Sequence, residues 1–192
     1  MNRRSYDRLL WVAAIALPIF AVVAAILAVR THDAGSRVPA GAVIHDFVAT
    51  PVGEDRPAPS FDLPSLVGSG RIDLARYRGR LVVLNIWASW CDPCRRDAAA
   101  LEAVARQNPR VVVLGVDHED GRADALSFRR RFGLTYPIAF DANGSVASAF
   151  GAVGLPTTYF VDPNGRVRFR LLGRVTTEIL ESLISRLSSF GW

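Results

Sequence analysis

The sequence contains no lysine, one methionine, three histidines and only two cysteines in 192 residues. All 23 basic residues are therefore arginine, which we interpret as a bias of composition and not as chemistry. One pair of cysteines is too few for a zinc site with four thiolate ligands. The net charge of +5 is too small to indicate a nucleic-acid-binding surface. The length is short for two domains but sufficient for one domain with a substantial core.

The two cysteines stand together in the segment WASWCDPC, residues 87–94. An apolar run, Leu81 to Trp87, precedes them and predicts a strand, whereas Arg95 to Gln107 predicts a helix. This order places Cys91 at a helix N-terminus, where unpaired N–H groups and the helix dipole favour a thiolate. We therefore interpret Cys91 as a candidate nucleophile, with Cys94 as the thiol that resolves a mixed disulfide.

This segment resembles the thioredoxin superfamily, specifically the membrane-anchored branch of extracytoplasmic thiol-disulfide reductases that includes the cytochrome c maturation proteins. Three further segments match that branch: APSFDL at 58–63, YRGR at 77–80 and GLPTTYFVD at 154–162. Together the matches cover about residues 55 to 190. The resemblance implies a thioredoxin-like α/β fold with an N-terminal β-hairpin and a central insertion, preceded by one transmembrane helix.

The resemblance also implies further site residues. Pro156 matches the cis-proline that faces the cysteines in this fold, and Leu155 before it would present its backbone to a substrate in a groove shared with Trp90. Asp97 stands where the anchored branch favours a glutamate, and we expect it to help move the proton of Cys94. The alternative is that Asp97 is a plain acid on the helix surface.

Two residues between the cysteines are expected to tune the redox potential. Pro93 at the first helical turn costs no hydrogen bond there. Asp92 places a negative charge beside the sulfur of Cys91, which should raise the thiol pKa and move the site toward the reducing end of the range. The alternative for Asp92 is an exposed acid at a helix start.

Three positions differ from patterns of the superfamily, and the last of them leaves the substrate open. Asn85 occupies the position of a buried aspartate in thioredoxins proper, and Ala99 that of a proline in the anchored branch. Thr157 follows the expected cis-proline, where reductases specific to c-type cytochromes often carry a glutamate.

Other interpretations of the cysteines are a structural disulfide, a copper site and a peroxidatic site. A disulfide across so short a loop would constrain the unfolded chain little. A copper chaperone could use Cys91, Cys94 and His118, although the related copper proteins have a spacing one residue longer, and His118 itself is expected to be exposed. A peroxidatic cysteine would follow a threonine, whereas Ala88 stands three residues before Cys91. We expect no metal, and no cofactor beyond the redox-active disulfide.

The N-terminal part contains an uncharged run of 21 residues, Leu9 to Val29, which is long enough to span a bilayer. Arginines precede this run, so the positive-inside rule predicts a cytoplasmic tail over 1–8 and an extracytoplasmic catalytic domain. A cleaved signal peptide is the alternative, but its apolar core is usually shorter. Residues 30–57 are expected to be a linker, with a short strand over Ile44 to Val48, and 58–192 the thioredoxin-like domain.

The apolar runs Leu81 to Trp87 and Val111 to Val116 predict central strands of a parallel βαβ unit. Phe61 to Leu66 and Arg71 to Leu74 predict a hairpin around a glycine-rich turn. The remaining predicted elements are helices over about 123–132, 145–150 and 176–188, and strands over 138–140, 159–161 and 166–172.

The sequence thus predicts a membrane-tethered protein-disulfide reductase. The resemblance implies client proteins with cysteines, such as apocytochrome c, and an integral-membrane electron donor of the CcdA/DsbD type. A disulfide oxidase or isomerase of the same fold is the alternative with the same chemistry, and the copper chaperone is the alternative of another class.

Overall fold

The computed structural model describes residues 43–44, 47–51 and 56–189, within a compact unit, Ala40–Trp192. The expected tail and transmembrane segment, residues 1–29, lie outside the described residues. None of the described helices is long and apolar enough to cross a membrane.

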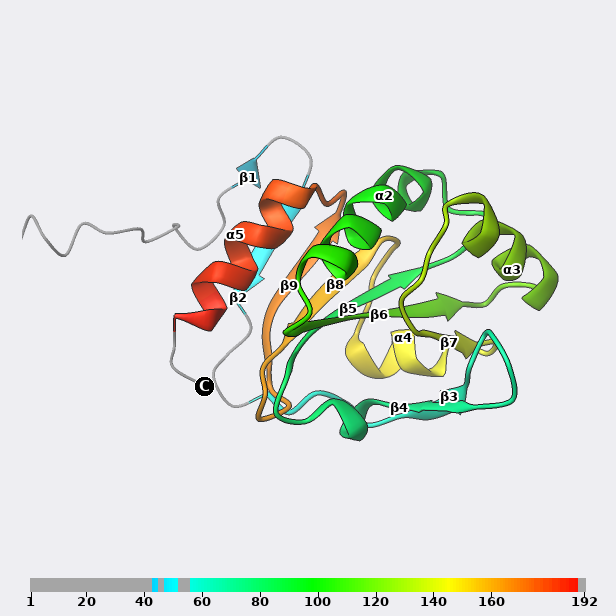
Figure 1. Ribbon diagram of the computed structural model, residues 1–192, viewed down its shortest axis with the longest axis horizontal. Helices are drawn as coiled ribbons and strands as arrows, with labels where there is room; N and C mark the ends of the chain where they lie inside the picture. Colours follow the sequence, from blue (N-terminus) through cyan, green and yellow to red (C-terminus); the bar gives the residue numbers. More distant parts are fainter. Residues whose placement is uncertain (1–42, 45–46, 52–55, 190–192) are drawn as a thin grey trace, which may run out of the picture. The chain divides into compact units, whose positions relative to one another are not determined.

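A seven-stranded sheet with the order β1-β2-β9-β8-β5-β6-β7 forms the centre of this unit (Figure 1). Strands β5, β6 and β7 run parallel, whereas the neighbouring pairs β1–β2, β2–β9, β9–β8 and β8–β5 are antiparallel. The bounds are Val43–Ile44 for β1, Phe47–Pro51 for β2, Leu81–Trp87 for β5, Val111–His118 for β6, Ile138–Asp141 for β7, Thr157–Val161 for β8 and Val167–Gly173 for β9.

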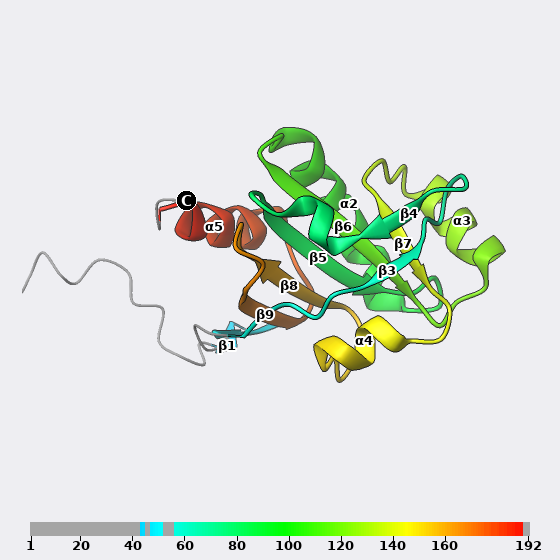
Figure 2. The ribbon, with the colours of Figure 1, turned by 90° about the horizontal axis from the view of Figure 1, so that it is seen from below.

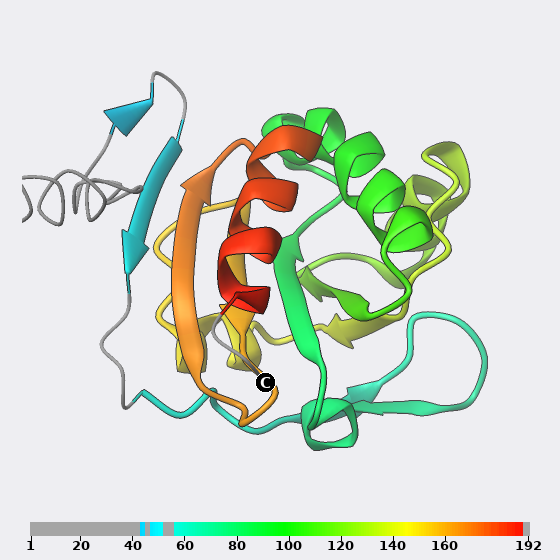
Figure 3. The same ribbon diagram turned by 60° about the vertical axis from the view of Figure 1, so that its left-hand side comes forward.

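The central strand β5 is buried along its whole length, and its side chains alternate between two hydrophobic cores. Leu81, Val83 and Trp87 belong to the core beneath three helices: α2 (Asp92–Gln107), α3 (Arg122–Arg131) and α5 (Thr177–Ser188). Figure 3 shows α2 and α5 side by side over this face of the sheet.

The opposite face is covered by the short helix α4 (Ser145–Phe150), the turn η1 (Leu74–Tyr77) and the expected hairpin, β3 (Asp62–Pro64) with β4 (Arg71–Asp73). Figure 2 shows α4 and the hairpin on this side. Both faces of the parallel strands are therefore covered, as their uninterrupted apolar sequences predict.

The expected linker differs from the structure. Two strands, β1 and β2, lie within 30–57, where one short strand over Ile44 to Val48 was expected. Strand β2 pairs with β9 along Phe47–Pro51, so the folded unit begins before residue 58. The physical reason is that β9 would otherwise present an unpaired edge, which the preceding segment covers by backbone hydrogen bonds.

Candidate functional site

The cysteines lie where β5 passes into α2, at the carboxyl end of the parallel strands. Cys91 is the N-cap of α2, and its Sγ accepts a hydrogen bond from the backbone N–H of Cys94 at 3.2 Å. Pro93 occupies the first turn, where no N–H is required. Cys91 and Cys94 form a disulfide with Cα atoms 5.3 Å apart. The predicted delivery of Cys91 to a helix N-terminus is therefore observed.

The surroundings of the two sulfur atoms differ. Both cysteines are buried, with 5% of Cys91 and 3% of Cys94 exposed. Of the two, it is Cys91 that lines an open groove of about 660 Å³. The other residues lining this groove are Trp90, Asp92, Pro93, His118, Ala147, Ser148, Ala152, Val153, Gly154 and Leu155. The groove thus leaves an approach to Cys91, with the exposed Trp90 at its side.

The loop before β8 forms the wall of the groove that faces Cys91. Its Leu155–Pro156 peptide bond is cis, as the resemblance implies, and Leu155 lines the groove. Thr157 is buried and its Oγ1 donates a hydrogen bond to the carbonyl of Gly154 at 2.6 Å. The backbone N–H of Gly173 donates to the carbonyl of Pro156 at 3.0 Å. These contacts hold Leu155 at the groove.

Asp97 lies one turn after Cys94 on α2 and is directed into the protein, with 1% of its surface exposed. Burial raises the pKa of Asp97 to about 7, although the backbone N–H of Val175 and the charges of Arg174 and Arg96 lower it. The Nε of Arg174 lies 4.0 Å from its Oδ1. Asp97 is therefore a buried carboxyl that can take up or release a proton near neutral pH, and not a solvated acid of the helix surface.

Asn85 has an uncharged side chain at the position where thioredoxins carry a buried aspartate. Its side chain is buried on β5, and Nδ2 donates to Oγ1 of Thr158 on β8 at 2.9 Å. Strand β5 therefore offers an amide at this position, and the buried acid three residues after Cys94 is Asp97 on α2.

Asp92 points into solvent beside the disulfide. Its carboxylate forms an ion pair with Arg95 at 2.9 Å, and both side chains are largely exposed. The guanidinium of Arg95 offsets the charge of Asp92 and also donates to the carbonyl of Ser89. The influence of Asp92 on Cys91 is therefore weaker than an unpaired carboxylate would exert.

The position of His118 differs from expectation. We expected an exposed loop histidine, but His118 is the last residue of β6, its side chain is 19% exposed, and it lines the groove with Cys91. Parallel pairing of β5 with β6 carries the end of β6 to the edge of the sheet where Cys91 lies. Within the described part of the chain, no three histidine, cysteine or acidic residues are grouped to hold a metal ion.

Sequence reasoning missed Ser89, Asp117 and Asp120, which are close in sequence to the groove residues Trp90 and His118. The backbone N–H and the hydroxyl of Ser89 both donate to the carboxylate of Asp120, and Asp117 beside it is completely buried. The sequence signal that could have revealed Asp117 and Asp120 was their position after the apolar residues of β6. This strand pairs with β5, which leads to the cysteines.

A scan against protein families matches residues 55–170 to the AhpC/TSA family. The chain belongs to this family. Within it, the chain is 37% identical over 123 residues to "Thiol-disulfide oxidoreductase ResA" of Geobacillus thermodenitrificans, covering 63% of this chain and 70% of that protein. It is 34% identical over 135 residues to "Thiol:disulfide interchange protein DsbE" of Escherichia coli, covering 69% and 72%.

Two solved structures share the architecture. A DsbF homologue from Corynebacterium diphtheriae superposes with a TM-score of 0.66 at 29% identity, covering 72% of this chain and 92% of that chain. A secreted thiol-disulfide isomerase from Corynebacterium glutamicum superposes with a TM-score of 0.64 at 28% identity, covering 73% and 90%. The thioredoxin-like α/β fold expected from the sequence is thus confirmed. With these relatives and its Cys91–Cys94 pair, the chain is a thiol-disulfide oxidoreductase.

Proposed function

We propose that this oxidoreductase works as a reductase of client disulfides, with Cys91 as nucleophile and Cys94 as the resolving thiol. The observation that carries the assignment is the asymmetry of the site: both cysteines are buried, but it is Cys91 that lines the groove, whereas Cys94 lies within α2, one turn before the buried Asp97. The N-cap position of Cys91 also favours its thiolate, because the backbone N–H of Cys94 in the first turn of α2 donates to the sulfur.

The reaction consists of two exchanges. The Cys91 thiolate attacks one sulfur of the client disulfide, a mixed disulfide forms, and the other client sulfur leaves as a thiolate that takes a proton from solvent. Cys94 then passes its proton to the carboxylate of Asp97 and attacks Sγ of Cys91. The mixed disulfide breaks and the second client thiolate leaves. The client has gained two electrons, and the chain ends with the Cys91–Cys94 disulfide.

The side chains around Cys91 match a protein client. Trp90 is 57% exposed and Val153 is 78% exposed, which makes them two of the large apolar side chains that the described surface leaves open. Both line the groove, together with Leu155. An extended client segment could cover them while its disulfide reaches Cys91, and Leu155 would offer backbone groups to that segment.

The resemblance of the sequence supports a cellular setting for this reaction. The apolar run Leu9 to Val29 would anchor the chain in a membrane with residues 1–8 in the cytoplasm and the catalytic domain outside. There the protein would reduce cysteines of clients such as apocytochrome c, and an integral-membrane electron donor would return it to the dithiol form. The site needs no cofactor besides its own disulfide.

The reduction potential tests the direction of the reaction. Trp87 and Trp90 flank the disulfide, so fluorescence should follow its redox state when the purified full-length chain is titrated with reduced and oxidised dithiothreitol. We expect a potential more negative than about −200 mV, toward the value near −270 mV of a thioredoxin. A potential near about −120 mV would instead assign the chain as an oxidase.

A further inference from the structure

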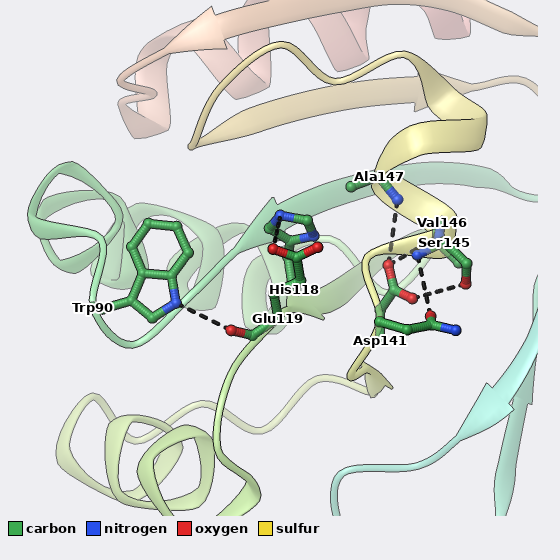
Figure 4. Close-up of polar contacts among 8 residues, drawn as sticks. Trp90, His118, Glu119, Asp141, Ser145, Val146 and Ala147 are labelled. Carbon is green, nitrogen blue, oxygen red and sulfur yellow. Dashed lines mark hydrogen bonds and ion pairs between the residues drawn. The ribbon is translucent and has the colours of Figure 1, made fainter.

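The segment Ser89–Trp90, which leads into Cys91, is held by the loop that follows β6. Asp120 Oδ2 accepts the backbone N–H of Ser89 at 2.6 Å, and Oδ1 accepts its hydroxyl at 2.9 Å. Nε1 of the neighbouring Trp90 donates to the carbonyl of Glu119 at 3.3 Å, as Figure 4 shows. We call residues 119–120 the clasp.

The clasp is itself supported from β7 and α4. The backbone N–H of Glu119 donates to the carbonyl of Asp141 at 3.0 Å. The carboxylate of Asp141 caps the start of α4 through the N–H groups of Val146 and Ala147 (Figure 4). At Gly144, a Cβ atom would lie 2.5 Å from Oε1 of Glu119, so the two loops are closely packed. The clasp therefore rests on a buried part of the fold.

The contact of Asp120 with Ser89 is not explained by a local role of Asp120. An aspartate just before a helix commonly caps it, but α3 has Gly121 as its N-cap and no side-chain cap hydrogen bond. The carboxylate instead reaches a segment 31 residues earlier in the chain. A carboxylate is suited to this contact because both of its oxygens accept, and Ser89 offers two donors.

Asp117, at the end of β6, is the buried acid that interacts with Asp120. Its side chain is completely buried at the end of β6. Burial, and then the charge of Asp120 and a hydrogen bond with it, raise the pKa of Asp117 to about 8; Arg122 lowers it and Asp141 raises it further. Asp117 is therefore largely protonated at pH 7. A protonated Asp117 places no second negative charge beside the carboxylate of Asp120 that binds Ser89.

We propose that Asp120 is a positioning residue of the dithiol reaction, which fixes Ser89 and Trp90 so that Cys91 keeps its place at the N-terminus of α2. Without the clasp, the sulfur of Cys91 would spend less time near the backbone N–H groups that stabilise its thiolate. The inference rests on Cys91 as the nucleophile, and it holds for either direction of the reaction.

The test is the pH profile of Cys91 alkylation in the reduced full-length chain, with iodoacetamide as the probe and mass spectrometry to locate the modified cysteine. In Asp120→Asn, which keeps the size but offers one acceptor atom, we expect the midpoint of the profile to rise. A rise of about half a pH unit to one unit lowers the rate at a pH below the midpoint roughly three- to ten-fold, because only the thiolate reacts.

The direction in which the midpoint of the alkylation profile shifts distinguishes the possible roles of Asp120. The matched control is Asp124→Asn, which removes the same charge from an exposed residue of α3 without a bond to Ser89. If Asp120 acted only through its charge, Asp120→Asn would lower the midpoint; if it only stabilised the fold, the melting temperature would fall and the midpoint would stay. Either result overturns the proposal.

A second variant covers the case in which Asp120→Asn does not fold. Ser89→Ala removes the hydroxyl donor from the other side of the contact and leaves both acids in place, and we expect a smaller rise of the midpoint. An unchanged or lowered midpoint in this variant would also overturn the proposal. If alkylation occurred at Cys94 and not at Cys91 in the unaltered chain, the proposed nucleophile itself would be wrong, which is a separate outcome.

Discussion

Cys94 and Asp97 occupy successive turns of α2, and both are almost completely buried, with 3% and 1% of their surface exposed. Residues three apart on a helix lie on the same face, so α2 carries the carboxyl of Asp97 on the same buried face as Cys94. Burial raises the pKa of Asp97 to about 7, which suits a group that accepts a proton at neutral pH. This pairing leads to the first two predictions.

Replacing Asp97 by Asn should slow the second exchange. The thiol of Cys94 would lack its buried acceptor, and we expect resolution of a mixed disulfide between Cys91 and glutathione to slow roughly a hundred-fold at pH 7. Stopped-flow fluorescence of Trp90 can follow this step. Asp124→Asn serves as the control, and an unchanged rate of resolution in Asp97→Asn would remove Asp97 from the mechanism.

The same carboxyl should make stability depend on pH. The pKa of Asp97 is about 7 in the folded chain, against the ordinary aspartate value of 3.8, so between these values the folded state holds a proton that the unfolded state has released. This contribution is complete below about pH 4, and it is lost as pH rises toward 7, by up to about 1.4 kcal/mol per pH unit. Urea unfolding at several pH values should show a flatter profile for Asp97→Asn. An equal slope in both proteins would contradict the raised pKa.

The order of attack can be read from trapped intermediates. Cys94→Ser leaves the groove-lining thiol without a resolving partner, so we expect mixed disulfides with clients to accumulate. Cys91→Ser leaves only the buried thiol, and we expect no such adducts. Non-reducing gels of the two variants, run before and after reduction, distinguish these results. Adducts in Cys91→Ser alone would reverse the two roles.

Trp90 should matter more for protein clients than for small disulfides. Its indole is 57% exposed beside the groove, where it can pack against a client segment. For Trp90→Ala we expect about a ten-fold loss of kcat/KM with a protein disulfide, as an exposed aromatic contributes a substantial part of an interface. The rate with oxidised glutathione should fall less, because it loses only what the hydrogen bond from Trp90 to Glu119 contributes to the position of Cys91. Equal losses with both substrates would place Trp90 in the chemical step.

Asp92 should tune the potential only slightly. Its charge raises the Cys91 thiol pKa in our interpretation, but the exposed ion pair with Arg95 offsets that charge. Asp92→Asn should therefore shift the potential to less negative values by less than about 30 mV, the equivalent of about 1.4 kcal/mol for two electrons. The fluorescence titration of Trp87 and Trp90 measures this shift. A shift in the negative direction would show that Asp92 acts in another way.

The sequence alone determined the central unit of the fold and the redox pair. The uninterrupted apolar run of β5 predicted a buried strand, and the helical pattern after it placed Cys91 at the start of α2. These features are local, because strand and helix periodicity and the cap position depend on neighbouring residues. The resemblance added the cis bond before Pro156, which the structure contains.

Tertiary structure decided the environment of the ionisable side chains. Asp97 is buried because Arg174 and Val175, far along the chain, lie next to it, and Asp120 contacts Ser89 because β6 pairs with β5 in parallel. Strand β2 joined the sheet because β9 offered it an open edge. The desolvation that shifts a pKa and the partner that completes a hydrogen bond both come from segments distant in sequence, so no local pattern contains them.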